Sequence, residues 1–161
     1  MNLSIAAERS RSPTLRAASV RVSRQLRASP ERIFDAWLDA GAARAVLAAG
    51  GIAHAAGTEI DARISGEFRI VHQRGGEEVE YSGEYLEIDR PHRLVFSLFV
   101  ERYAQWDDRV IVELAPVAGQ SLLVLTHELS LPSPAQRSRV LRGWTRVMDG
   151  LAVTLATSRR G

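Results

Sequence analysis

His127 is the residue of this sequence best suited to acid–base chemistry. It shares the alternation of Leu123, Leu125 and Leu129, so it faces the same side of a strand as those leucines. An imidazole titrates near neutrality, which suits a general acid or base, or the anchor of a ligand. A buried imidazole also needs a hydrogen-bond partner, so the alternative is a structural histidine bonded to a backbone carbonyl or a carboxylate. The sequence leaves both interpretations open.

The other three histidines are expected to be solvated. His72 lies on an inward alternation but close to a hairpin end, while His54 sits in a glycine-flanked linker and His92 in a turn. The four histidines are not spaced as metal ligands, and the chain has no cysteine. All 21 cationic residues are arginine, which excludes a Schiff-base or P-loop lysine. The sequence therefore predicts neither a metal site nor a cofactor.

Aromatic side chains supply most of the candidate wall of a binding cavity. Tyrosine suits such a wall because it joins an apolar ring to a polar tip. For each of these residues the alternative is ordinary core packing. Together with His127, the candidate ligand-binding residues are Phe68, Tyr81, Tyr85, Phe96, Trp106, Trp144 and Met148.

Acidic residues near the end of one strand give a second, weaker candidate. Glu101, Asp107 and Asp108 flank a loop and would place a carboxylate at a pocket mouth, but solvated loop acids are the favoured interpretation. Asp61 and Arg63 lie two residues apart, and we expect them to form a surface ion pair.

The bulk composition is that of one ordinary globular domain. The chain has 161 residues, 45% of them apolar, and a formal net charge of only +2. Nothing in this balance points to nucleic acid, and no apolar run is long enough to span a bilayer. We expect a cytoplasmic protein with a disordered tail over residues 1–18 and a single domain over residues 19–161.

Helix and strand signals alternate clearly along the chain. Residues 20–26 read as a strand, and Ser29-Pro30 starts a short helix that is followed by an Ala-rich helix to about Ala49. A linker marked by glycines from Gly50 to Gly57 comes next. From Glu59 the period changes to two, which predicts about six short strands joined by turns. Ile60, Ala62 and Ile64 share the inward parity there, with a bulge or bend at Gly66.

The last helix organises the fold. Ser133, Pro134 and Gln136 form its start, and the apolar face runs from Val140 to Leu155. The helix also keeps Gly143 and Gly150, each costing about 1 kcal/mol of helix propensity, which indicates close packing or free space beside them.

This order predicts an α+β fold: a curved antiparallel sheet wrapped around a long C-terminal helix, with two short helices after the first strand. The chain resembles the helix-grip superfamily of START-like and SRPBCC proteins, and within it the AHSA-type branch, named for activators of the heat-shock-ninety chaperone ATPase. The resemblance spans about residues 19–157. It is carried by the motifs at residues 28–37, 60–68, 83–96, 123–128 and 143–144.

The resemblance implies a cavity between the sheet and the last helix. We therefore expect the binding of a small hydrophobic or amphipathic molecule there, without nucleic-acid binding or membrane insertion. One alternative is an enzyme of cyclase or hydrolase type that uses His127. Another is a module that contacts a chaperone ATPase, and a homodimer is a further expected form of association.

Overall fold

The computed structural model describes residues 18–52, 55–100, 107–130 and 133–158. In chain order the elements are β1 (Ala18–Leu26), α2 (Pro30–Leu38), α3 (Ala40–Ala49), β2 (Ala55–Ile60), β3 (Glu67–Arg74), β4 (Glu77–Asp89), β5 (Arg93–Val100), β6 (Asp108–Val117), β7 (Gln120–Leu129) and α4 (Pro134–Ser158). This order confirms the predicted α+β helix-grip fold. The expected N-terminal tail, His54, Glu101 and Trp106 lie outside the described residues.

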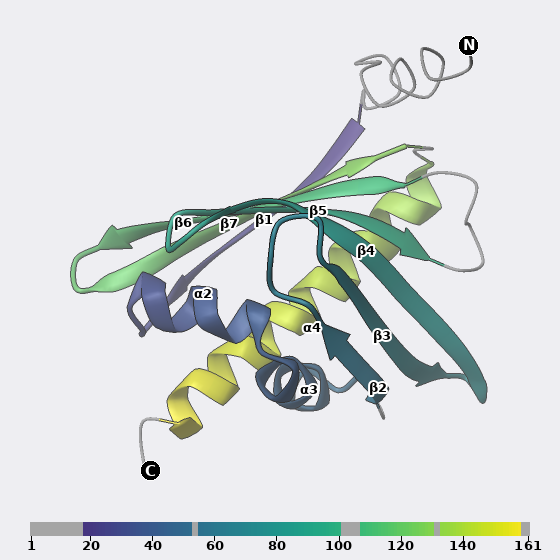
Figure 1. The fold of residues 1–161 in the computed structure, drawn as a ribbon, viewed down its shortest axis with the longest axis horizontal. Helices are drawn as coiled ribbons and strands as arrows, with labels where there is room; N and C mark the ends of the chain where they lie inside the picture. Colours follow the sequence, from purple (N-terminus) through teal and green to yellow (C-terminus); the bar gives the residue numbers. More distant parts are fainter. Residues whose placement is uncertain (1–17, 53–54, 101–106, 131–132, 159–161) are drawn as a thin grey trace.

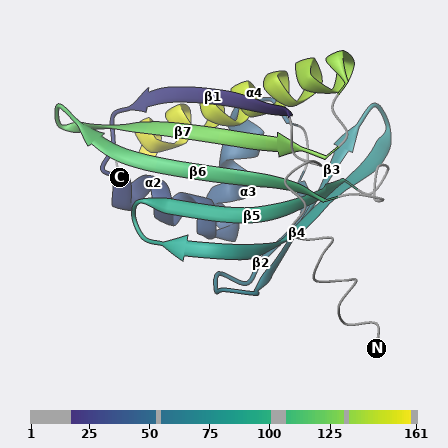
Figure 2. The same cartoon turned by 90° about the horizontal axis from the view of Figure 1, so that it is seen from above.

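One antiparallel sheet forms the first layer of the molecule. Its strand order is β1-β7-β6-β5-β4-β3-β2, so the first strand lies beside the last. The helices α2, α3 and α4 lie together on one side of the sheet, and α4 crosses beneath it (Figure 1). Seen from above, four strands lie side by side in the order β1, β7, β6 and β5, and the helices lie behind them (Figure 2).

Helix α4 begins and packs as its sequence predicts. The backbone N–H of Gln136 donates to Ser133 Oγ at 3.2 Å, so Ser133 is the N-cap. Met148, Leu151 and Leu155 are buried in the core cluster. Each such side chain contributes about 1.5–3 kcal/mol of burial free energy, so this face fixes the helix against the sheet.

Asp39 sets the geometry of the two short helices. It follows the last residue of α2, and its carboxylate accepts a hydrogen bond from the backbone N–H of Ala42 at 2.8 Å, which caps α3. The Ser29 side chain caps α2 in the same manner through the N–H of Arg32. The chain therefore turns sharply between the two helices.

Helices α3 and α4 touch through their backbones. A Cβ on Gly150 would lie 1.9 Å from the carbonyl oxygen of Val46, and one on Gly50 would lie 2.3 Å from that of Arg146. Real Cβ atoms do not approach carbonyl oxygens so closely, so the crossing requires glycine at both positions. Gly143, by contrast, has open space beside it.

The predicted continuous alternation from Glu59 onward is wrong between Asp61 and Gly66. There the chain leaves the sheet in a turn closed by bonds from Arg63 N to Asp61 O and from Gly66 N to Arg63 O. Ile64, expected on the inner face, is 54% exposed as a result. The ion pair expected between Asp61 and Arg63 is present, at 2.8 Å.

Two further expectations of exposure are corrected by the sheet. The expected linker up to Gly57 is shorter, because β2 starts at Ala55 and pairs with β3. His72 is buried, not solvated, since the β3–β4 hairpin extends past it and its ring stacks on Tyr81 with centroids 5.0 Å apart. Among the described residues, no helix is long and apolar enough to cross a membrane.

Candidate functional site

A chain of hydrogen bonds joins β6, β7 and α4 through His127. Nε2 of His127 lies 2.7 Å from Asp108 Oδ2, and the indole Nε1 of Trp144 donates to His127 Nδ1 at 2.9 Å. The backbone N–H of Ser130 donates to the other Asp108 oxygen at 2.9 Å. The expected inward direction of His127 is confirmed, and its partner on one side is a carboxylate.

The partners of His127 fix the position of its ring proton. An indole N–H can only donate, so Nδ1 must be the acceptor and Nε2 must carry the hydrogen that faces Asp108. Neither ring nitrogen is free in this arrangement. His127 thus orients Trp144, and a role as general base would first require the Trp144 bond to break.

Asp108 is a buried carboxylate, which corrects the expectation of a solvated loop acid. Burial alone would raise its pKa, but the hydrogen bonds from His127 and Ser130 outweigh burial and hold the pKa below the usual range. Asp108 is the first residue of β6, and its side chain is only 14% exposed. Asp107 is exposed as expected, and Glu101 lies outside the described residues.

Aromatic rings form a continuous row from α4 to β4. Trp144 packs on Trp37 with ring centroids 6.0 Å apart, and Trp37 packs on Phe96 at 6.4 Å. Phe96 then meets Phe68 edge-on at 5.3 Å, and Phe68 meets Tyr85 at 5.5 Å. The row brings four of the predicted wall residues together across the inner face of the sheet: Phe68, Tyr85, Phe96 and Trp144.

The predicted wall residues differ in how much of their surface is left open. Phe68, Tyr85, Phe96, His127 and Met148 are buried in the core, whereas Tyr81 and Trp144 are only half-buried. Burial, and next to it the negative charge of Asp61, raises the pKa of Tyr85, so its phenol stays protonated. Trp106 cannot be placed among them.

Trp37 belongs to the site, although the sequence analysis does not place it among the predicted wall residues. Its ring lies between Trp144 and Phe96, and its Nε1 is buried without a hydrogen-bond partner among the described residues. Trp37 follows the buried Ile33 and Phe34 of α2 by four and three residues, so helical spacing could have placed it on the inward side. Spacing does not show whether its indole N–H finds a hydrogen-bond acceptor.

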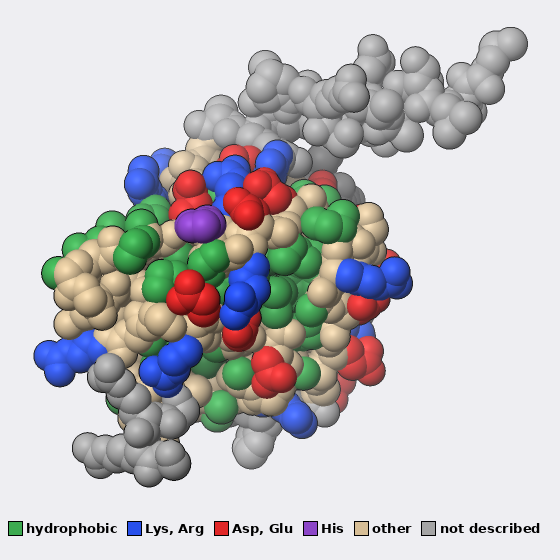
Figure 3. Space-filling view, turned by 60° about the vertical axis from the view of Figure 1, so that its left-hand side comes forward, with side chains coloured by type: hydrophobic (Ala, Val, Ile, Leu, Met, Phe, Trp, Pro, Cys, Tyr) green, Lys and Arg blue, Asp and Glu red, His purple; other side chains and the backbone are tan. Residues whose placement is uncertain are grey.

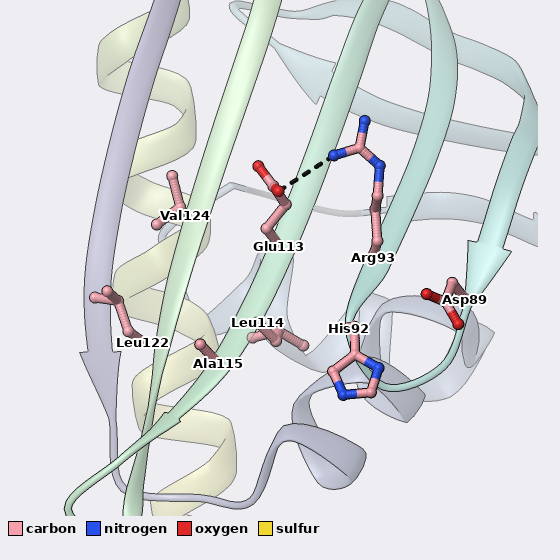
Figure 4. A pocket seen from close by; sticks show the side chains of 8 residues that line it. All are labelled: Asp89, His92, Arg93, Glu113, Leu114, Ala115, Leu122 and Val124. Carbon is pink, nitrogen blue, oxygen red and sulfur yellow. Dashed lines mark hydrogen bonds and ion pairs between the residues drawn. The ribbon is translucent and has the colours of Figure 1, made fainter.

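Two open depressions of the described surface lie outside the row of rings. One, of about 330 Å³, lies at the β4–β5 turn beside β6 and β7. It is lined by Arg93, which bonds Glu113 at 3.2 Å, and by Leu122 and His92 (Figure 4). The other, of about 490 Å³, lies between Leu26 at the end of β1 and Leu155 of α4. In the first depression Arg93 and Glu113 pair with each other, and in the second Arg24 pairs with Asp149.

Charge is mixed on the face of the molecule that Figure 3 shows. Arginine and acidic side chains alternate there with hydrophobic ones (Figure 3), in keeping with the small net charge of +2. This face therefore offers no patch of one sign to a highly charged partner.

Solved structures of bacterial proteins share this fold. A protein of Chromobacterium violaceum is 26% identical, with a TM-score of 0.68 over 84% of this chain and 96% of its own. Proteins of Rhodobacter sphaeroides and Rhizobium leguminosarum are 22% and 23% identical, both with a TM-score of 0.74. They cover 88% and 87% of this chain and 93% and 95% of their own.

The family is shown by a second comparison. No curated protein matches the chain. The model of the family described as activator of Hsp90 ATPase homolog 1-like protein matches residues 27–156, which is most of the domain and includes both ends of the row of rings. Together with the helix-grip fold, this match confirms the resemblance that the motifs suggested, and the chain belongs to the activator of Hsp90 ATPase homolog 1-like family.

Proposed function

We propose that this protein binds a small, largely apolar molecule between α4 and the half of the sheet formed by β2 to β5. The observation that carries the proposal is a set of large apolar side chains that pack on the core yet stay half-buried. This inner apolar surface consists of Trp37, Ile60, Ile70, Tyr81, Trp144 and Val147.

The inner apolar surface comes from elements that face one another. Trp37 lies on α2, and Trp144 and Val147 lie on α4, while Ile70 pairs with Tyr81 across β3 and β4. Directly paired residues of antiparallel strands share a face, so both strands contribute to the same side. A ligand covering this surface would gain about 25 cal/mol per Å² of apolar area before the costs of association.

Two alternatives have less support. An enzyme of cyclase or hydrolase type would use His127, whose two ring nitrogens are both engaged by Asp108 and Trp144. A chaperone ATPase as partner is supported by the family description alone.

The proposal predicts that a large side chain placed on the inner apolar surface weakens ligand binding. Val147→Trp adds an indole on the inner side of α4, whereas Val153→Trp makes the same change on the same helix at a position 54% exposed. Titration with the neutral fluorophore N-phenyl-1-naphthylamine should give a saturable emission increase in wild type and Val153→Trp. Val147→Trp should bind at least about fivefold more weakly.

Native mass spectrometry of freshly purified protein gives an independent reading. A co-purifying small molecule is expected with wild type and is expected to be lost in Val147→Trp. Equal fluorophore affinity in all three proteins would contradict the proposed location of the site.

A further inference from the structure

Two tryptophans of the site differ in one respect that bears on ligand chemistry. The N–H of Trp144 is satisfied by His127, whereas the N–H of Trp37, in the neighbouring ring 6.0 Å away, is buried without a partner among the described residues. A buried donor left unpaired is unfavourable, and such groups are rare in folded proteins. The indole of Trp144 therefore has a hydrogen-bond acceptor within the protein, and the indole of Trp37 has none among the described residues.

A second unpaired polar atom lies on β2. Thr58 Oγ1 is buried and has no hydrogen-bond partner among the described residues. Thr58 pairs with Ile70, so its side chain shares the inner face with Ile70 of the inner apolar surface. An indole N–H on α2 and a hydroxyl on β2 are therefore both buried without a hydrogen-bond partner among the described residues.

Charge on the ligand is disfavoured by its surroundings. The buried polar residues of the described chain are His72, Ser97, Ser121 and His127, with no arginine or carboxylate among them. Arg109 also has a buried Nε without a partner, but it precedes the inward-facing Val110 on β6, so it lies on the other face of the sheet. The half-buried carboxylate of Asp108 is already bonded to His127 and Ser130. A ligand charge would enter this space without a counter-ion, at a cost of several kcal/mol.

From these observations we infer that the ligand is a neutral, mainly apolar molecule bearing a carbonyl or ether oxygen, and that this oxygen accepts a hydrogen bond from Trp37 Nε1. This inference rests on the proposed function, since it specifies the chemistry of the same site.

The test compares two probes of one shape. In 2-acetylnaphthalene a carbonyl oxygen occupies the place that a CH₂ group occupies in 2-isopropenylnaphthalene. Both are titrated into the full-length ¹⁵N-labelled protein, and the three tryptophan indole N–H resonances are followed by NMR and assigned with Trp37→Phe and Trp144→Phe. The acetyl probe should move the Trp37 indole proton downfield, whereas the hydrocarbon should not.

Affinities of the variants complete the test. Trp37→Phe should weaken the acetyl probe about fivefold more than it weakens the hydrocarbon, as expected for one neutral hydrogen bond. Trp144→Phe, which removes an indole N–H already bonded to His127, should change both probes by the same factor. The downfield shift in wild type does not depend on any variant folding.

The outcomes separate the inference from the proposed function. If both probes bind but Trp37→Phe affects them equally and the Trp37 resonance responds to neither oxygen nor CH₂, the inference is overturned while the apolar site stands. If neither probe perturbs any indole or methyl resonance of the inner apolar surface, the proposed function is overturned, and the inference with it.

Discussion

His127 shows how one residue can look catalytic and yet serve to hold a neighbour. Its ring receives the Trp144 indole on one side and faces the Asp108 carboxylate on the other. The three residues come from α4, β7 and β6, so the bonds tie the long helix to two strands of the sheet. The position of the Trp144 ring, and through it the outline of the inner apolar surface, depends on this tie.

Asp108 should make the protein sensitive to acid. Its pKa is lowered in the fold, whereas an aspartate of the unfolded chain titrates near about 4. The stabilisation by the ionised carboxylate is therefore complete above that value and is lost as the pH falls through the folded pKa. Urea unfolding of the wild type should show stability falling as the pH drops below about 4.

Asp108→Asn removes this dependence at a cost in stability. The variant should be less stable at pH 7 by about 1.5–3 kcal/mol, the worth of hydrogen bonds to a charged group, and its stability should change less below pH 5. Asp107→Asn alters the exposed neighbouring acid and should follow the wild type. Parallel pH profiles for wild type and Asp108→Asn would contradict the role assigned to this carboxylate.

The sequence could predict the direction of His127 but not its partners. Alternation along β7 indicates which side chains face inward, because it depends on neighbours in one strand. Asp108 was assigned to a solvated loop because it is the first residue of β6, where no alternation has yet begun. The hydrogen bonds of His127 to Asp108 and Trp144 join different elements, so they can be identified only from the folded structure.

At the scale of elements, the contact between α3 and α4 carries a testable contrast. Gly150→Ala would press a Cβ onto the carbonyl oxygen of Val46, while Gly143→Ala would point a Cβ into open space on the same helix. Both changes improve helix propensity by about 1 kcal/mol. Only the first forces two helices apart.

Chemical denaturation should separate the two glycines by sign. Gly143→Ala is expected to raise the free energy of unfolding by about 0.5–1 kcal/mol, and Gly150→Ala to lower it by about 2 kcal/mol or more. The Gly150 expectation fails if that variant is as stable as Gly143→Ala.

Helix boundaries were the most predictable elements because capping is local. Ser29, Asp39 and Ser133 each bond an N–H three residues further along the chain. The excursion at Asp61–Gly66 was missed because Ile60, Ala62 and Ile64 keep the spacing of a strand while the chain turns away. Spacing alone cannot report a turn whose hydrogen bonds are made by the backbone.

At the scale of the whole molecule, stability should depend on the core and little on surface charge. The ion pairs of Arg63 with Asp61 and of Arg90 with Asp35 are exposed, and Arg24 with Asp149 is partly so. Such pairs contribute little to stability and are screened by salt. Raising sodium chloride from 0.05 M to 1 M should therefore change the free energy of unfolding by less than about 1 kcal/mol. A loss of several kcal/mol would show that surface charge contributes far more.

The pairing of β1 with β7 has a consequence for biosynthesis. Ala18 at the start of the domain pairs with Leu129, and α4 follows only after that. On the ribosome, β1 and α2 emerge long before their partners, so the sheet cannot close until nearly the whole chain has left the exit tunnel. Contacts this distant in sequence slow folding and leave apolar surface open to other nascent chains in the interval. A chain of this topology therefore exposes its inner apolar face to other molecules for most of the time that it takes to be made.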